Sequence, residues 1–116
     1  MSPSTLEYLH HIWDETRYLT SQTKGLSKAK FMRDETLQRA FVRSLEIICE
    51  AVKQLPDDLT SKYSHVEWRA IAGMRNKLIH DYFGVDYDLV WDALVTKVPQ
   101  LQQEIMQIIQ KEESDS

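Results

Sequence analysis

The chain holds few of the residues that cross-link, bend or interrupt a fold. Its 116 residues include one cysteine, three glycines and three prolines. The lone Cys49 excludes an internal disulfide and a zinc site built from several cysteines. No apolar run approaches the roughly 18 residues of a membrane span, and no basic segment followed by an apolar run marks a leader. These absences predict a cytoplasmic protein with no membrane partner, no metal and no cofactor.

An excess of basic residues is also missing. The chain has 14 Lys and Arg against 18 Asp and Glu, which gives a formal net charge of -4. Proteins that coat nucleic acid non-specifically depend on many Lys and Arg contacts to phosphates. The charge therefore counts against such a protein, and an RNA substrate would need a local site to attract it. With 42% hydrophobic and 28% charged residues, the composition is that of a globular domain.

Apolar residues recur at helical rather than alternating spacing almost throughout, so we expect an all-α fold without a sheet. The predicted architecture is an up-down bundle of four to five helices in one domain, residues 1–110, followed by a frayed polar tail, residues 111–116. Capping residues, glycines and prolines set the expected segments: a helix from Ser4 to Gly25, a helix over 27–55, a loop over 56–62, a helix from Ser64 to His80 or Tyr82, a helix capped by Asp86, and a kink or a fifth helix at Pro99.

The segment from Trp68 to Phe83 is the most informative, because an arginine interrupts its apolar face. At about 100° per residue, Arg75 shares the packing face of the predicted helix with Ile71 and Leu78. A buried guanidinium is costly without a partner. Arg75 should therefore pair with a carboxylate of the long second helix, Glu46 or Glu50, or face a cleft that binds an anion.

His80 lies five residues after Arg75, which in a continuous helix turns it about 140° away. One regular helix therefore cannot make a site from both residues. Either the helix loosens near its end, or a two-fold related copy presents the same residues across the axis. We favour the second arrangement, a homodimer, because it gathers two Arg75, two His80 and two Tyr82 side chains around one groove.

Residues 75–82 resemble the Arg-x4-His-x-Tyr signature of HepT-like toxins, within the broader Arg-x4-6-His pattern of HEPN ribonucleases. The likeness covers about the last three quarters of the chain. It also rests on Phe31, Glu50-Ala51, Trp68, Phe83-Gly84-Val85-Asp86-Tyr87, Val90-Trp91 and Pro99-Gln100-Leu101. One departure is Cys49, which stands where the family has glycine.

The resemblance implies a dimeric HEPN-like bundle that cleaves RNA without a metal, the ribose 2′-hydroxyl attacking the adjacent phosphate. His80 would then act as general base or acid, since histidine titrates near neutral pH. Arg75 would stabilise charge on the phosphate oxygens, and Asn76 would orient the phosphate or the imidazole by hydrogen bonding. Glu50 would hold Arg75 in position as an acidic partner that does not itself contact the RNA. The substrate would be RNA, such as tRNA or mRNA, and not DNA.

The resemblance also implies a toxin–antitoxin system. Its antitoxin would be a minimal nucleotidyltransferase that transfers AMP to the tyrosine of the signature, which is Tyr82 here. A bulky anion beside Arg75 would block the groove by volume and by charge. Toxin and antitoxin would form a larger hetero-oligomer.

Other functions and roles stay open at this point. The chain is alternatively a non-catalytic HEPN module that binds a nucleotide or a nucleotidyltransferase, or a purely structural helical adaptor. Arg75 and His80 would then be structural. For the other histidines, His10, His11 and His65, solvated side chains are favoured over a metal site. The three tryptophans are expected in the core or at a dimer contact. Lys62, Arg69 and Lys77 are interpreted either as a modest basic rim beside the groove or, nearly as well, as ordinary solvated charges.

Overall fold

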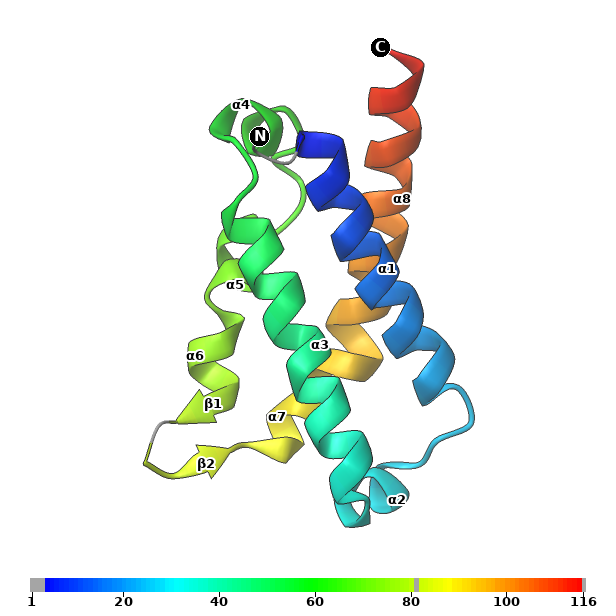
Figure 1. Ribbon diagram of the computed structural model, residues 1–116, viewed down its shortest axis with the longest axis vertical. Coiled ribbons are helices and arrows are strands. Elements are labelled where there is room, and N and C mark those ends of the chain that lie inside the picture. The colour runs from blue at the N-terminus through cyan, green and yellow to red at the C-terminus, as the bar shows by residue number, and fades with distance from the viewer. Residues whose placement is uncertain (1–3, 81, 116) are drawn as a thin grey trace.

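The computed structural model describes residues 4–80 and 82–115, and three long helices dominate it (Figure 1). The elements, in chain order, are α1 (Thr5–Thr23), α2 (Lys28–Arg33), α3 (Glu35–Lys53), α4 (Asp57–Lys62), α5 (Trp68–Ala72), α6 (Met74–Leu78), β1 (Ile79–His80), β2 (Gly84–Val85), α7 (Tyr87–Asp92), the π-helical turn η1 (Ala93–Lys97) and α8 (Val98–Ser114). The predicted helical class is confirmed, whereas the chain divides into more and shorter helices than the four to five expected.

Helix α1 begins and ends where the sequence predicts. The Ser4 hydroxyl accepts from the Glu7 N–H at 3.2 Å, and the Glu7 carboxylate accepts from the Ser4 N–H at 3.3 Å. These two bonds satisfy donors that a helix N-terminus leaves free. Gly25, with a φ of 76°, takes the left-handed conformation just after the helix. Helix α1 packs along both α3 and α8 and lies between them (Figure 1).

The predicted second helix divides at Asp34, which ends α2 and caps α3. Its carboxylate accepts from the Leu37 N–H at 3.0 Å, and its own backbone is extended (φ −108°, ψ 96°). The apolar spacing continues across Asp34 and therefore gives no sign of this break. The break forms because the Asp34 side chain caps α3 and competes with the backbone bonds of a continuous helix. The break lets Phe31 of α2 fold back on Phe41 of α3, with stacked rings 5.8 Å apart.

Between α3 and α6 the chain differs most from the prediction. The expected loop over 56–62 contains the short helix α4, and the Ser64 capping box is not used because the next helix starts at Trp68. The Trp68 indole N–H donates to the Tyr63 carbonyl at 3.0 Å and fixes the turn between them. Gly73 then separates α5 from α6, and α6 ends at Leu78.

A two-stranded hairpin follows, so the expectation of no sheet is wrong. Ile79 pairs with Val85 and His80 with Gly84 in antiparallel register, and the Asp86 N–H donates to the Leu78 carbonyl at 2.8 Å. Gly84 has a φ of 82°, a conformation that favours glycine in a turn. Strands of two residues are too short to produce the alternating pattern by which sheets are recognised in a sequence.

The C-terminal half of the bundle is built as one continuous helical path. Asp86 caps α7 as predicted, its carboxylate accepting from the Leu89 N–H at 3.1 Å. Pro99 lies in the first turn of α8, directly after η1. Because Pro99 has no N–H to donate, the helix widens into a π turn before it instead of breaking.

The expected frayed tail is instead helical, since α8 continues to Ser114. The Glu112 carboxylate accepts from the Lys62 ammonium at 2.9 Å and from the Tyr63 hydroxyl at 2.6 Å, which ties the end of α8 to α4. Ser116 lies outside the described residues. In the part of the chain that the structure describes, no helix combines the length and the apolar character needed to cross a bilayer.

Candidate functional site

Arg75 lies on α6 and reaches the long helix α3. Its Nε atom is 3.4 Å from Oε2 of Glu46, and the side chains of Arg75 and Glu46 are 38% and 28% exposed. The pairing agrees with the expectation of a carboxylate partner on the second helix and selects Glu46 from the two candidates. Within the described residues, the terminal nitrogens of the guanidinium form no hydrogen bond or ion pair, so they are available to an anion.

The start of α6 rests directly on Cys49 of α3. Burial raises the pKa of the Cys49 thiol, while a hydrogen bond from the backbone of Arg75 acts in the opposite direction. A buried thiol with a raised pKa stays protonated and inert at neutral pH. Cys49 therefore acts here as a small core residue beneath Arg75.

Glu50 does not share this ion pair. Its side chain is exposed and lines a separate hollow between α1 and α3, together with His11, Arg43, Ile47, Ala51 and Gln54. No ion pair joins Glu50 to Arg75 among the described residues. Its supporting role stays a prediction, and Glu46 is the carboxylate that the structure places beside the arginine.

His80 is exposed in β1, directly opposite Gly84 of β2. Because α6 ends at Leu78, the geometry of a continuous helix no longer relates His80 to Arg75. This corresponds to the first of the two predicted arrangements, in which the helix loosens near its end. No hydrogen bond between Arg75 and His80 occurs in the described residues, and Asn76 is exposed on α6. A single chain thus places the three candidate catalytic residues on consecutive elements without joining them directly.

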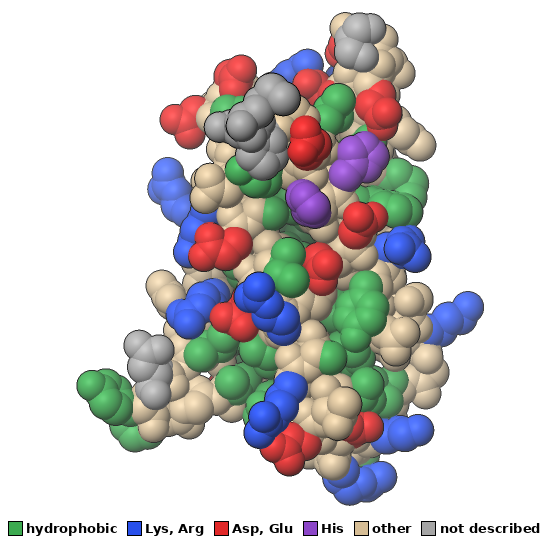
Figure 2. Space-filling view, in the orientation of Figure 1, with side chains coloured by type: hydrophobic (Ala, Val, Ile, Leu, Met, Phe, Trp, Pro, Cys, Tyr) green, Lys and Arg blue, Asp and Glu red, His purple; other side chains and the backbone are tan. Residues whose placement is uncertain are grey.

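The tip of the hairpin carries two of the most exposed apolar side chains of the described chain. Tyr82 is 96% exposed and Phe83 is 91% exposed. Figure 2 shows hydrophobic side chains protruding at the corner of the molecule that the β1–β2 hairpin occupies in Figure 1. Asp81 lies outside the described residues. The sequence did not predict this exposure, because the expected helix extended to His80 or Tyr82 and left no hairpin turn at these residues.

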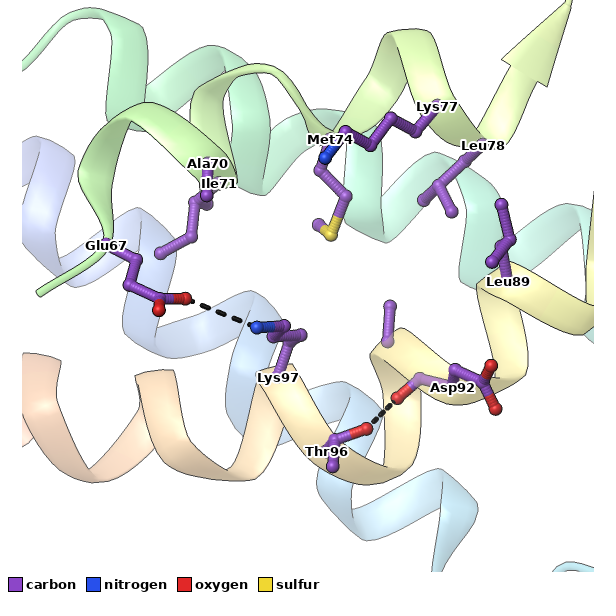
Figure 3. Close-up of a pocket in the computed structure, with 11 residues that line it drawn as sticks. Glu67, Ala70, Ile71, Met74, Lys77, Leu78, Leu89, Asp92, Thr96 and Lys97 are labelled. Carbon is purple, nitrogen blue, oxygen red and sulfur yellow. Dashed lines mark hydrogen bonds and ion pairs between the residues drawn. The ribbon is translucent and has the colours of Figure 1, made fainter.

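An apolar groove opens on another face of α6 (Figure 3). It holds about 230 Å³ between α5–α6 and α7–η1, and its apolar walls include Ile71, Met74 and Leu78. At its end, the Lys97 ammonium lies 3.2 Å from a Glu67 carboxylate oxygen. Arg75, Asn76, His80 and Tyr82 do not line it. Arg75 instead reaches toward α3, where its guanidinium lies beside Glu46.

The expected basic rim is only partly assembled. Lys62 is held on α4 by Glu112 and lies apart from α6. Arg69 and Lys77 are exposed on α5 and α6, and no ion pair holds either of them in the described part of the chain. Of the histidines considered for a metal, His10 lies 3.7 Å from a Glu113 carboxylate oxygen and His11 lines the α1–α3 hollow.

Comparisons with known proteins agree on one family. The family described as Ribonuclease HepT-like matches residues 12–108. A protein of Caldanaerobacter subterraneus subsp. tengcongensis named "Putative RNase" is 50% identical over 105 residues, covering 90% of this chain and 94% of its own. A "Putative RNase" of Methanocaldococcus jannaschii is 40% identical over 108 residues, covering 93% and 89%.

A protein of Thermococcus cleftensis named "Probable ribonuclease HepT" is 37% identical over 101 residues, covering 87% of this chain and 92% of its own. No solved structure gave a significant match. The family match spans most of the chain, including every candidate residue from Glu46 to Tyr82. The chain belongs to the HepT-like ribonuclease family.

Proposed function

We propose that this chain is a metal-independent endoribonuclease, the toxin of a toxin–antitoxin pair. One observation carries the proposal: Arg75, held by Glu46 at 3.4 Å with its terminal nitrogens available, precedes an exposed His80 in a family whose members are named ribonucleases. The substrate is RNA, such as tRNA or mRNA. Cleavage of labelled RNA by the purified protein in the presence of EDTA tests the proposal.

The residue types supply what transesterification of RNA requires. The 2′-hydroxyl oxygen attacks the adjacent phosphorus, its proton passes to a base, and the P–O5′ bond breaks while an acid protonates the leaving O5′. One imidazole serves as the base and a second as the acid, and Arg75 stabilises charge on the phosphate oxygens. Asn76, exposed on α6, orients the phosphate or an imidazole.

A homodimer completes this site. Within one chain, His80 has no hydrogen bond to Arg75 among the described residues, and each chain offers one His80. A two-fold axis beside the hairpin brings a second Arg75 and a second His80 to the same phosphate, since an isologous interface repeats each residue. The pair then provides both the base and the acid.

We further propose that the antitoxin, a minimal nucleotidyltransferase, inactivates the enzyme by adding AMP to Tyr82. The hydroxyl of a side chain that is 96% exposed is accessible to another enzyme. The added phosphate carries negative charge beside Arg75, and the nucleoside adds bulk, so both effects oppose RNA binding.

The modification predicts a specific result for Tyr82→Phe. This variant is expected to retain RNA cleavage and to gain no AMP when it is incubated with the antitoxin and ATP, because it lacks the acceptor oxygen. Intact-protein and peptide mass spectrometry measures the transfer. Tyr87→Phe, which changes a partly buried tyrosine of α7, serves as the matched control and should still accept AMP. Transfer to Tyr82→Phe at the wild-type rate would place the modification elsewhere.

Glu46 is proposed as the residue that positions Arg75. Glu46→Gln removes the charge that holds the guanidinium, and we expect kcat to fall by about tenfold or more, since small misplacements of catalytic groups cost up to roughly a hundredfold. Glu50→Gln is the comparison, because Glu50 lies four residues further along α3 and has no ion pair with Arg75 in the described residues. A loss in Glu50→Gln alone would assign the supporting role to Glu50, and equal losses in both variants would show that the effect is not specific to Glu46.

A non-catalytic partner-binding module is the second candidate function. The apolar groove beside α6 and the exposed tip favour it, because exposed apolar surface marks protein contacts. Under this alternative, wild-type protein and the Arg75 and His80 variants are equally inert on total RNA and bind a nucleotidyltransferase equally well.

A further inference from the structure

The aromatic tip of the β1–β2 hairpin is unlike the rest of the described surface. Among the described residues, the other exposed large apolar side chains are 38% to 48% exposed: Met32, Leu89, Val95 and Met106. Tyr82 and Phe83, at 96% and 91%, are left almost wholly in water. Leaving a phenyl ring in water forgoes the free energy of its burial, so the ring is available to pack against another molecule.

The pairing of the hairpin strands places Gly84, the residue after the tip, opposite His80. Backbone pairing of Ile79 with Val85 and of His80 with Gly84 sets the register, and the bond from Asp86 N–H to the Leu78 carbonyl extends it at 2.8 Å. Directly paired Cα atoms of antiparallel strands lie about 5 Å apart. Phe83 immediately precedes Gly84, so its ring is attached one residue from the position opposite His80.

The place of the tip beside His80 favours the RNA substrate of the proposed nuclease as its ligand. In the sequence, Arg75 and Lys77 lie before the tip, and Asp81, Asp86 and Asp88 lie beside or after it, so the segment carries no excess of basic residues. Lys77 is exposed without an ion pair in the described residues, whereas the Asp86 carboxylate caps α7 and Asp88 lies 3.0 Å from the Lys28 ammonium. Aromatic side chains stack on the unpaired bases of nucleic acids.

We propose that Phe83 is a stacking platform for an unpaired base of the RNA, beside the phosphate held by Arg75, and that the enzyme therefore selects single-stranded RNA. The placement beside the cleaved phosphate rests on the proposed nuclease function. Every base has a flat face, so stacking selects unpaired bases without selecting a sequence. Phe83 takes this role rather than Tyr82 because it adjoins Gly84, the cross-strand partner of His80.

The test measures binding rather than cleavage. Full-length protein carrying His80→Ala is titrated into single-stranded RNA labelled with 2-aminopurine, and into the same RNA as a duplex. Adding Phe83→Ala is expected to weaken single-strand binding by roughly ten- to a hundredfold, the range measured for lost base stacking, and to leave duplex binding unchanged. Phe83→Trp should keep the affinity and quench the probe. Phe83→Leu, apolar but not aromatic, should bind as weakly as Phe83→Ala.

Met106→Ala is the matched control, because Met106 is exposed on α8, a different element from the hairpin. It should leave RNA binding unchanged. The proposal is overturned if Phe83→Leu binds like the parent protein, if no single-stranded RNA binds, or if Phe83→Ala alters the oligomeric mass and not RNA affinity. The last result would make the tip a protein interface.

Failure of this proposal is distinguishable from failure of the nuclease proposal. If wild-type protein binds single-stranded RNA through Phe83 but cuts none, the stacking proposal stands and the nuclease proposal fails. If the Phe83→Ala protein cuts RNA as well as the wild type and binds it with unchanged affinity, the nuclease proposal stands and the stacking proposal fails.

Discussion

Replacing His80 by alanine is expected to lower the rate of RNA cleavage by about 10²–10⁴-fold, the usual contribution of a general acid or base. Arg75→Ala is expected to cost about 10²–10³-fold, as the loss of a group that stabilises transition-state charge does. Because His80 is exposed in β1, its replacement should change the free energy of unfolding little. Initial rates on an end-labelled RNA, compared with thermal unfolding of the same proteins, measure both effects.

His11→Ala is the control for these two variants, since His11 is an exposed histidine of α1, outside the proposed site. It should cut RNA at the wild-type rate. A His80→Ala protein that is folded and fully active would remove His80 from the chemistry. A loss of activity in all three variants would point to a general defect of folding or purification.

Phe31→Ala is expected to produce the largest loss of stability, about 3–5 kcal/mol, the range for a buried phenylalanine replaced by alanine. The Phe31 ring is fully buried and lies 5.8 Å from that of Phe41, 6.2 Å from that of Tyr87 and 5.3 Å from that of Trp91. It therefore joins α2, α3 and α7. Domains of this kind are stable by about 5–15 kcal/mol, so the variant should be partly unfolded at moderate temperature.

Denaturant unfolding followed by circular dichroism measures this change. Met32→Ala is the matched control, because Met32 is the next residue of α2 and is 38% exposed, and it should cost well under about 1 kcal/mol. Activity should fall with Phe31→Ala at temperatures where α7 detaches, since α7 holds the hairpin through Asp86. Equal unfolding free energies for the two variants would show that the aromatic cluster does not join these helices.

Local capping chemistry was the most predictable part of the fold. The Ser4 capping box, the Gly25 stop and the Asp86 cap all occur where the sequence places them, because each depends on bonds between near neighbours. The same rule failed at Ser64, which has the form of a capping box and starts no helix. The indole bond of Trp68 to the Tyr63 carbonyl fixes a turn there instead, and such tertiary contacts override local preference.

The shape of the site was less predictable than its residues. Helical periodicity identified Arg75 as a cation on a packing face, and Glu46 as one of two carboxylates within reach. It could not choose between Glu46 and Glu50, because that choice depends on how α6 lies against α3. Nor could it find the hairpin, since pairing of Ile79 with Val85 depends on a turn whose geometry no periodic pattern reports.

The most direct test of the central claim is cleavage of a labelled RNA in EDTA by the wild-type protein and by the double variant Arg75→Ala/His80→Ala. The substrate is compared with one that carries a single 2′-deoxy substitution at the cleaved position. The account predicts that only the wild type cuts, that its products end in 2′,3′-cyclic phosphate and 5′-hydroxyl groups, and that the deoxy substitution blocks cleavage. Equal cleavage by the folded double variant, or cleavage of the deoxy substrate at the same bond, would contradict it.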